Sequence, residues 1–168
     1  MSTWLVGGGA QTGVPRLERD PTTQTDSRKT VRDSSGWLVV AAEDDLIDRL
    51  EAAVGIEHSS STPSVNVGEP LLLVIFYANP GLRPDRTGDV RCDMKVIQPG
   101  GEVSTDKTDV GCFTGPLAEG EENLYRPGMI VRFTGEPADP KGEWEVRVTL
   151  RDVLREADIL LRASFILD

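Results

Sequence analysis

The chain has 168 residues, 38% hydrophobic and 5% aromatic, which suits one core with part of the chain left outside it. Its formal net charge of −10 excludes nucleic acid and anionic membrane surfaces as expected partners, because an acidic surface repels phosphate groups. No apolar run reaches the ~18 residues that a membrane-spanning helix needs, so no membrane insertion is predicted.

Residues 1–36 are predicted to form a flexible N-terminal arm or the remnant of a leader. From Pro21 to Ser35 the chain is nearly all polar, so it cannot bury enough apolar area to offset its ordering entropy. Trp4-Leu5-Val6 is an exception, an apolar triplet that could dock on the domain, add an edge strand or engage a partner. The N-terminus lacks the pattern of a secretory signal peptide. Two locations stay open: cytoplasmic, or extracytoplasmic (periplasmic or secreted) with the leader removed.

Residues 37–63 are predicted to hold a short strand, an amphipathic helix and a Ser-rich linker. The strand begins at Trp37, which we place in the core. Between Glu43 and Val54, apolar residues recur on one helical face, at Leu46, Ile47, Leu50, Ala53 and Val54. Acidic residues in the first turn and Gly55 at the end are typical helix boundaries.

Residues 64–168 are broken by turn residues at roughly ten- to fifteen-residue intervals. Strands are expected at 64–67, 71–78, 90–96, 102–106, 109–114, 129–134, 143–151 and 159–167. The run from Leu71 to Ala78 is apolar on both faces, as a central strand is. About seven or eight short strands without intervening helices predict an antiparallel β-sandwich or barrel.

Strict period-2 alternation marks residues 143–151 as a half-buried strand. We expect its apolar face at the centre of the core, packed near apolar residues of other strands. The predicted core set is Trp144, Val146, Val148, Leu150, Ile75, Met94, Val131 and Phe165.

Three segments of this region also carry a resemblance: 67–71 (Val-Gly-Glu-Pro-Leu), 96–101 (Val-Ile-Gln-Pro-Gly-Gly) and 140–148 (Pro-Lys-Gly-Glu-Trp-Glu-Val-Arg-Val). With them, residues 64–168 resemble bacterial immunoglobulin-like and fibronectin-III-like β-sandwich modules. The resemblance implies an antiparallel immunoglobulin-like sandwich, and it says little about function because such sandwiches host unrelated activities. The chain lacks the cysteines of the antibody inter-sheet disulfide, so antibody-like binding loops are not implied.

Cys92 and Cys112 are the only cysteines, and they lie on segments that we place side by side. A disulfide between them would close a loop of about 20 residues, contribute ~3 kcal/mol and imply an oxidising compartment. The alternative is two buried free thiols. Without a nearby histidine, the pair does not complete a zinc site.

Other chemical patterns are incomplete. His58, the only histidine, lies in the Ser-rich linker and no nucleophile motif accompanies it, so it is not expected to be catalytic. Residues 7–13 have the glycine spacing of a phosphate-binding loop, but Val14 stands where the lysine is required. Acidic residues gather in loops at 85–89, 106–109 and 119–122 without a calcium-loop motif. We expect no catalytic residue, metal or cofactor.

The sequence therefore predicts a non-enzymatic module for protein–protein interaction or assembly, acting through edge strands, loops or the N-terminal arm. Two alternatives stay open. One is a calcium-dependent carbohydrate-binding or hydrolytic domain on the same sandwich. The other is a structural subunit of a secreted assembly or filament whose arm is exchanged between subunits.

Overall fold

A computed structural model of the chain describes residues 2–6, 25–42, 62–116, 124–125 and 129–168. These residues form strands and turns with no helix, so the described fold is all-β. The helix predicted at 43–54 lies outside the described residues. The strands are β1 (Ser2–Val6), β2 (Arg28–Val31), β3 (Ser34–Ala42), β4 (Ser64–Val65), β5 (Pro70–Ala78), β6 (Thr87–Ile97), β7 (Val103–Pro116), β8 (Leu124–Tyr125), β9 (Met129–Thr134), β10 (Gly142–Asp152) and β11 (Ala157–Leu167).

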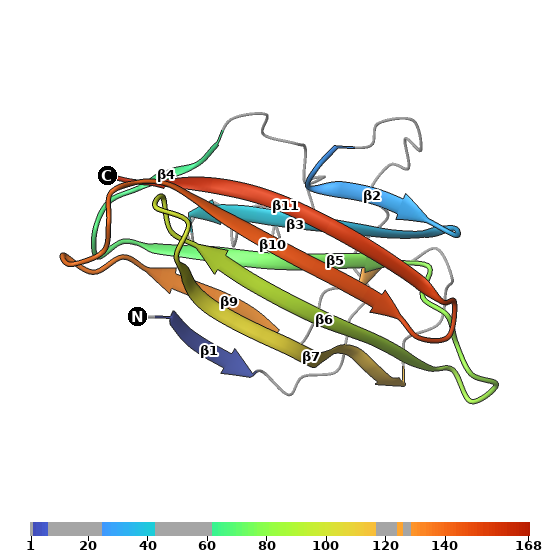
Figure 1. Cartoon of the computed structure of the whole chain (residues 1–168). Coiled ribbons are helices and arrows are strands. Elements are labelled where there is room, and N and C mark those ends of the chain that lie inside the picture. Colours follow the sequence, from blue (N-terminus) through green and yellow to red (C-terminus); the bar gives the residue numbers. More distant parts are fainter. Residues whose placement is uncertain (1, 7–24, 43–61, 117–123, 126–128) are drawn as a thin grey trace.

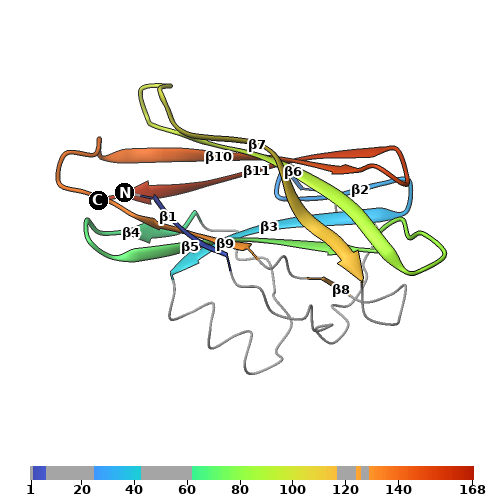
Figure 2. The ribbon, with the colours of Figure 1, turned by 90° about the horizontal axis from the view of Figure 1, so that it is seen from below.

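The strands form two sheets that lie face to face, as Figures 1 and 2 show. Sheet A has the order β1-β9-β5-β3-β2, with β8 also paired to β5. Sheet B has the order β4-β11-β10-β6-β7. All pairs are antiparallel except β4 with β11. The prediction of a mostly antiparallel, sandwich-like fold is confirmed.

The core between the sheets is built on alternation. Every second residue of β10, from Trp144 to Asp152, is buried, and the residues between them are partly or fully exposed. Trp144 stacks on Phe165, with ring centroids 5.9 Å apart, and contacts Phe133 at 5.1 Å. Its indole N–H donates to the Pro140 carbonyl at 2.9 Å, so the buried polar group has a partner.

The two sheets meet closely on one side and end separately on the other. On the close side, the Arg162 amide of β11 donates to the Asp26 carbonyl just before β2, at 2.7 Å. Gly36 of β3 also lies on this side, where a Cβ would stand 2.7 Å from Leu150 Cδ1 and 3.4 Å from Ile159 and Leu161 side-chain atoms, so a larger residue would need the tip of Leu150 to shift. On the other side, β1 and β7 are the last strands of their sheets.

A second apolar cluster lies on the face of sheet A that is turned away from sheet B. It consists of the β5 residues that alternate with the core residues, namely Leu72, Val74, Phe76 and Ala78, and it confirms that β5 is apolar on both faces. Trp37 packs here, partly buried, with the Arg28 guanidinium 4.9 Å above its ring. Placing Trp37 in the core was therefore wrong: its position on β3 pairs with Phe76, which belongs to the outer face.

The strand boundaries differ from the expectation in two places. Residues 28–36, predicted as part of the flexible arm, form β2 and the start of β3, and the short strand predicted from Trp37 forms the rest of β3. Both strands belong to sheet A, although they were predicted to lie outside the sandwich at 64–168. The segments predicted at 102–106 and 109–114 form one strand, β7, which accommodates a register shift opposite Cys92 to Met94. Asp109, with φ of 55°, occupies the left-handed region beside that bulge.

Candidate functional site

The N-terminal strand β1 completes the edge of sheet A. It pairs antiparallel with β9 over five residues, from Ser2 opposite Phe133 to Val6 opposite Met129. The predicted interaction triplet Trp4-Leu5-Val6 lies within this strand, and Trp4 stands opposite Val131. Figure 1 shows β1 beside β9 at the lower edge of the molecule, apart from β2 and β3. The N-terminal residues 2–6 thus form the edge strand of sheet A, next to β9.

The corresponding edge of sheet B is β7, and it carries features that oppose further pairing. Its pairing with β6 has three register shifts, which interrupt the regular ladder. Its side chains at 106–109 are exposed and charged or polar, and Asp106 pairs with Lys95 at 3.2 Å. Bulges and charged side chains are the means by which natural sheets protect an open edge from adding strands.

A disulfide between Cys92 and Cys112 ties β7 to β6, as predicted from the sequence. The two Cα atoms are 5.8 Å apart, and both residues are nearly inaccessible. The bond lies within one sheet, so it fixes the edge strand to its neighbour and does not join the two layers.

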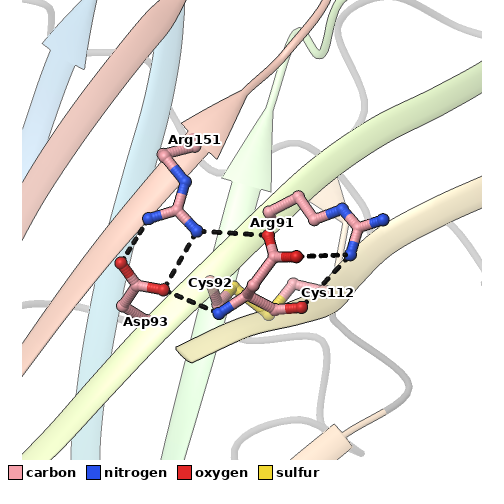
Figure 3. The surroundings of a disulfide bond; sticks show 6 residues. Arg91, Cys92, Asp93, Cys112 and Arg151 are labelled. Carbon is pink, nitrogen blue, oxygen red and sulfur yellow. Dashed lines mark hydrogen bonds and ion pairs between the residues drawn. A yellow bond between two sulfur atoms is a disulfide. The ribbon is translucent and has the colours of Figure 1, made fainter. Parts of the chain in front are cut away.

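Beside the disulfide, charged side chains form a connected network on the outer face of sheet B (Figure 3). Arg151 binds both carboxylate oxygens of Asp93 and also donates to Asp109 at 3.3 Å. The Asp109 amide donates to Asp93 at 2.8 Å, and Arg91 donates to the Asp109 carboxylate at 3.3 Å. The hydrogen bonds from Arg151 lower the pKa of Asp93 below its usual range and raise that of Arg151. The network holds the bulged part of β7 in place.

A buried carboxylate organises one end of the molecule. Asp152, 1% exposed, accepts four hydrogen bonds: from the Tyr77 hydroxyl at 3.0 Å and from the amides of Gly81, Leu154 and Arg155 at 2.7, 3.1 and 3.0 Å. Burial raises the pKa of Tyr77 far above its ordinary value, with the Asp152 charge acting in the same direction. The site joins β5, the loop after it and the β10–β11 turn, and its polar groups form hydrogen bonds with one another.

A small apolar pocket opens between the sheets on their separated side. Its volume is about 20 Å³, space for one water-sized group. Sheet A contributes Leu73, Ile75 and Val131, and sheet B contributes Cys92, Met94, Lys107, Val110 and Cys112. Lys107 is the one charged residue of this lining, and it lies on the exposed edge strand β7.

The remaining predicted residues take structural positions or lie outside the described ranges. The eight residues of the predicted core set, from Ile75 to Phe165, are all buried in one cluster. His58 and the glycine-rich segment 7–13 are outside the described residues, as is the acidic loop at 119–122. Asp85 accepts from Thr87 at 2.6 Å, and Asp89 pairs with Arg83 at 3.2 Å. Among the described residues no three potential ligands converge in a way that could hold a metal ion.

Two polar sites were missed at the sequence level. Asp152 follows Trp144, Val146, Val148 and Leu150 at period two, so its inward position was readable from the same alternation. The contact of Asp93 with Arg151 depends on the pairing register of β6 with β10, for which the sequence held no local signal.

Comparison with known proteins gives no family. No protein-family model matches the chain, and no curated protein matches it. The solved structures that resemble it include a family 123 glycoside hydrolase from Clostridium perfringens (TM-score 0.43, 7% identity, 77% of this chain and 27% of that one). Another is a Niemann-Pick type C2 protein from the Japanese carpenter ant (TM-score 0.42, 11% identity, 78% and 89%). A third is an alkylpurine DNA glycosylase from Pseudomonas fluorescens bound to DNA (TM-score 0.38, 14% identity, 62% and 27%).

The chain spans about a quarter of the length of the hydrolase and the glycosylase. Within the described ranges, no helix has the length and apolar character needed to cross a membrane. The class that the described structure defines is a two-sheet all-β protein with a disulfide-tied edge and an edge completed by its own N-terminal strand.

Proposed function

We propose that the chain is a non-enzymatic, immunoglobulin-like assembly module whose β9 edge is completed by an extended N-terminal strand that copies of the chain can exchange. The observation that carries the proposal is the pairing of β1 with β9. Residues 2–6 form the edge of a sheet beside a strand that lies more than a hundred residues later in the chain. The partner is a second copy of the same chain, and the exchanged element is β1.

The strand order supports this proposal. In the immunoglobulin fold one sheet has the order A-B-E-D and the other contains C, F and G. Assigning β3, β5 and β9 to A, B and E, and β6, β10 and β11 to C, F and G, reproduces both orders. The D position beside E is then held by β1. In the usual chain order D comes between C and E, so here an N-terminal strand takes a place that the intervening segment would otherwise fill.

The character of the two open edges also favours β9 as the acceptor. An unpaired edge strand presents a row of free backbone groups and readily adds another strand. The β7 edge is protected by bulges and charges. Strand β9 reads Met-Ile-Val-Arg-Phe-Thr, with one charged residue, and pairs regularly with β5. Without β1 this edge would be regular, apolar and open.

The connection between β1 and β2 is long enough for either arrangement. Four strand spacings of about 4.8 Å separate β1 from β2 across sheet A, a span of at least ~19 Å. Residues 7–24, about 18 positions, cover at most ~60 Å when extended. A strand on such a connection reaches its own β9 edge, and it also has the length to reach that of a neighbouring copy.

Shortening this connection provides the test. A chain lacking residues 8–23 leaves two residues between Val6 and Thr25, which span at most ~11 Å and cannot bridge ~19 Å within one copy. We expect this shortened chain to be a dimer at micromolar concentration by light scattering, because its β1 pairs only with the other copy. The matched control is the same shortened chain with residues 2–6 scrambled, which should be a monomer. A monomeric shortened chain, or a dimer that survives scrambling, would refute the proposal.

A further inference from the structure

Strand β7 is the outermost strand of sheet B, and its irregularities fall at particular residues (Figure 1). Its 14 residues pair with β6 in a register that shifts three times. Opposite Asp93 of β6, strand β7 holds two residues, Thr108 and Asp109. Further along β7 the register skips Cys112, so this cysteine is also an extra residue in the strand. Two of the three shifts therefore involve Asp109 and Cys112.

Three consecutive residues of β6 hold these two bulges. Asp93 accepts a hydrogen bond from the Asp109 amide at 2.8 Å, and Arg91 donates one to the Asp109 carbonyl at 3.1 Å. Cys92, between them, forms the disulfide with Cys112. Figure 3 shows Arg91, Cys92 and Asp93 beside Cys112. The residues that interrupt the β7 ladder are thus the ones that side chains of β6 bind.

The backbone of Asp109 is fully engaged by these contacts. An open sheet edge adds a strand because its outward N–H and C=O groups are free to pair. Here the amide and the carbonyl of Asp109 both bind side chains of β6, and its φ of 55° departs from the extended conformation. Its carboxylate also pairs with Arg91 and Arg151, each at 3.3 Å. An incoming strand would meet a bent backbone whose polar groups are already bonded.

We propose that the Asp109 bulge, held by Arg91 and Asp93, prevents β7 from pairing with the β7 edge of a second copy of the chain. The sequence around the bulge favours a second copy as the partner that is excluded. Antiparallel pairing about a two-fold axis at Thr108 would set Lys107 of each copy opposite Asp109 of the other, and opposite charges in such pairs are favourable. The inference concerns the edge of sheet B and does not rest on the exchange of β1.

The charged contacts at the bulge contribute little to the stability of the fold. The side chains of Asp109 and Arg91 are 69% and 37% exposed, and exposed ion pairs add little to the free energy of unfolding. A substitution at Asp109 should therefore leave the fold intact. The association of the folded chain can then be measured directly.

Two uncharged substitutions at Asp109 of the full-length chain provide a matched pair. Asparagine accepts a positive φ, whereas the β-branched threonine does not. Asp109→Thr should therefore favour a regular, extended edge, and Asp109→Asn should keep the bulge. In sedimentation velocity at micromolar concentration, we expect Asp109→Thr to form dimers of about twice the monomer mass and Asp109→Asn to remain a monomer. Equal behaviour of these two variants would overturn the inference.

Two further variants control for charge and for folding. Asp106→Thr removes the pair with Lys95 from a regular part of the same strand, and it should remain a monomer. The double variant Arg91→Ala, Asp93→Ala removes both side chains that bind the Asp109 backbone, so it should dimerise without any change in β7. Tryptophan fluorescence shows that each variant is folded. Dimers of Asp106→Thr, or a folded double variant that stays monomeric, would overturn the inference.

Hydrogen–deuterium exchange identifies the surface that pairs in the dimer. The comparison is between dimeric Asp109→Thr and the same variant diluted until it is monomeric. In the dimer, the fragment that carries residues 103–109 should exchange about tenfold more slowly, because its outward amides are then hydrogen-bonded. The fragment that carries β9 should not change. Slower exchange at β9 instead of β7 would assign the dimer to exchange of β1 and overturn the inference.

Reduction of the disulfide separates the two bulges. Cys112 belongs to the second bulge, so reduction should lower the concentration at which Asp109→Thr dimerises. The chain without substitutions should remain a monomer under the same reducing conditions, because the bulge at Asp109 persists. If that chain dimerises on reduction through β7, the disulfide closes the edge and the role proposed for Asp109 is wrong.

Discussion

Replacing Asp152 by asparagine tests the polar centre of the fold. Oδ1 of Asp152 accepts from the amides of Leu154 and Arg155, and Oδ2 accepts from Gly81 and the Tyr77 hydroxyl. Asparagine turns one of these oxygens into an NH₂ group, which cannot accept. Facing the turn, it would leave two backbone amides without an acceptor. Facing Tyr77, whose hydroxyl can turn to accept, it would still leave the Gly81 amide without one.

The loss in free energy of unfolding can be estimated from the number of backbone amides left without an acceptor. One buried amide without an acceptor costs ~1–3 kcal/mol, and the remaining bonds lose the assistance of the charge, which about halves their strength. We therefore expect Asp152→Asn to lower the free energy of unfolding by ~2–4 kcal/mol. Tyr77→Phe removes one donor of four and leaves the carboxylate satisfied by three amides, so it should cost ~1 kcal/mol.

Urea unfolding followed by tryptophan fluorescence measures both variants, with the slope against urea as the check that the unfolded states are comparable. If Asp152→Asn lowers the free energy of unfolding by less than ~1 kcal/mol, the reasoning that a buried amide loses its acceptor is refuted. So would a Tyr77→Phe variant that is destabilised as much as Asp152→Asn, since the hydroxyl would then be the main partner.

Three further outcomes are expected from the same structure. Trp144→Ala should lower the free energy of unfolding by ~3–5 kcal/mol in urea unfolding, because the ring is fully buried between Phe133 and Phe165; a change near 1 kcal/mol would contradict its central place. Reducing the Cys92–Cys112 bond, which joins residues 20 apart in sequence, should cost ~3 kcal/mol, measured with and without reductant against a Cys92→Ser, Cys112→Ser chain that should not respond. Burial raises the pKa of Tyr77, so the stability it confers should be complete below its unfolded pKa of about 10 and fall as the pH rises further; the Tyr77→Phe chain should lose this alkaline dependence.

The parts of the fold that could be predicted are those with a local signal. Strands β5, β6, β10 and β11 repeat their burial at every second residue or are apolar throughout, so composition and periodicity locate them. Two cysteines on either side of one turn indicated the Cys92–Cys112 disulfide as one of two alternatives, the other being two free thiols. In each of these cases the determining residues lie close together in sequence.

The β2–β3 hairpin was missed for a specific reason. Its two-residue turn is Arg32-Asp33, and both residues have positive φ, 47° and 66°. Such turns are usually marked by Asn-Gly or Asp-Gly, because few other residues tolerate this backbone conformation. The strand before the turn, Arg28-Lys29-Thr30-Val31, is also polar. Because of the polar composition and the unusual turn residues, the hairpin could not be predicted from the sequence. It is stabilised by its pairing with the rest of sheet A.

The candidate site was only half predictable for another reason. The apolar triplet at Trp4 stood out from a polar arm, which indicated an interaction, but its partner β9 lies more than a hundred residues later. No local pattern specifies a pairing at that separation. It depends on which edge the rest of the fold leaves open, and that is known only once both sheets are assembled.

Such a pairing is decided by concentration as much as by contacts. A strand donated by another copy can form the same backbone pairing with β9 as the chain's own β1, so the two arrangements differ mainly in whether the pairing is intramolecular or intermolecular. β1 belongs to the same chain as its own β9 edge, so pairing there is intramolecular and does not depend on protein concentration, whereas pairing with another copy does. At micromolar concentration the full-length chain should therefore pair β1 internally and remain monomeric. Exchange between full-length copies should appear when they refold together near millimolar concentration. It should also appear when several copies are bound next to one another on a larger assembly, because their local concentration is then high.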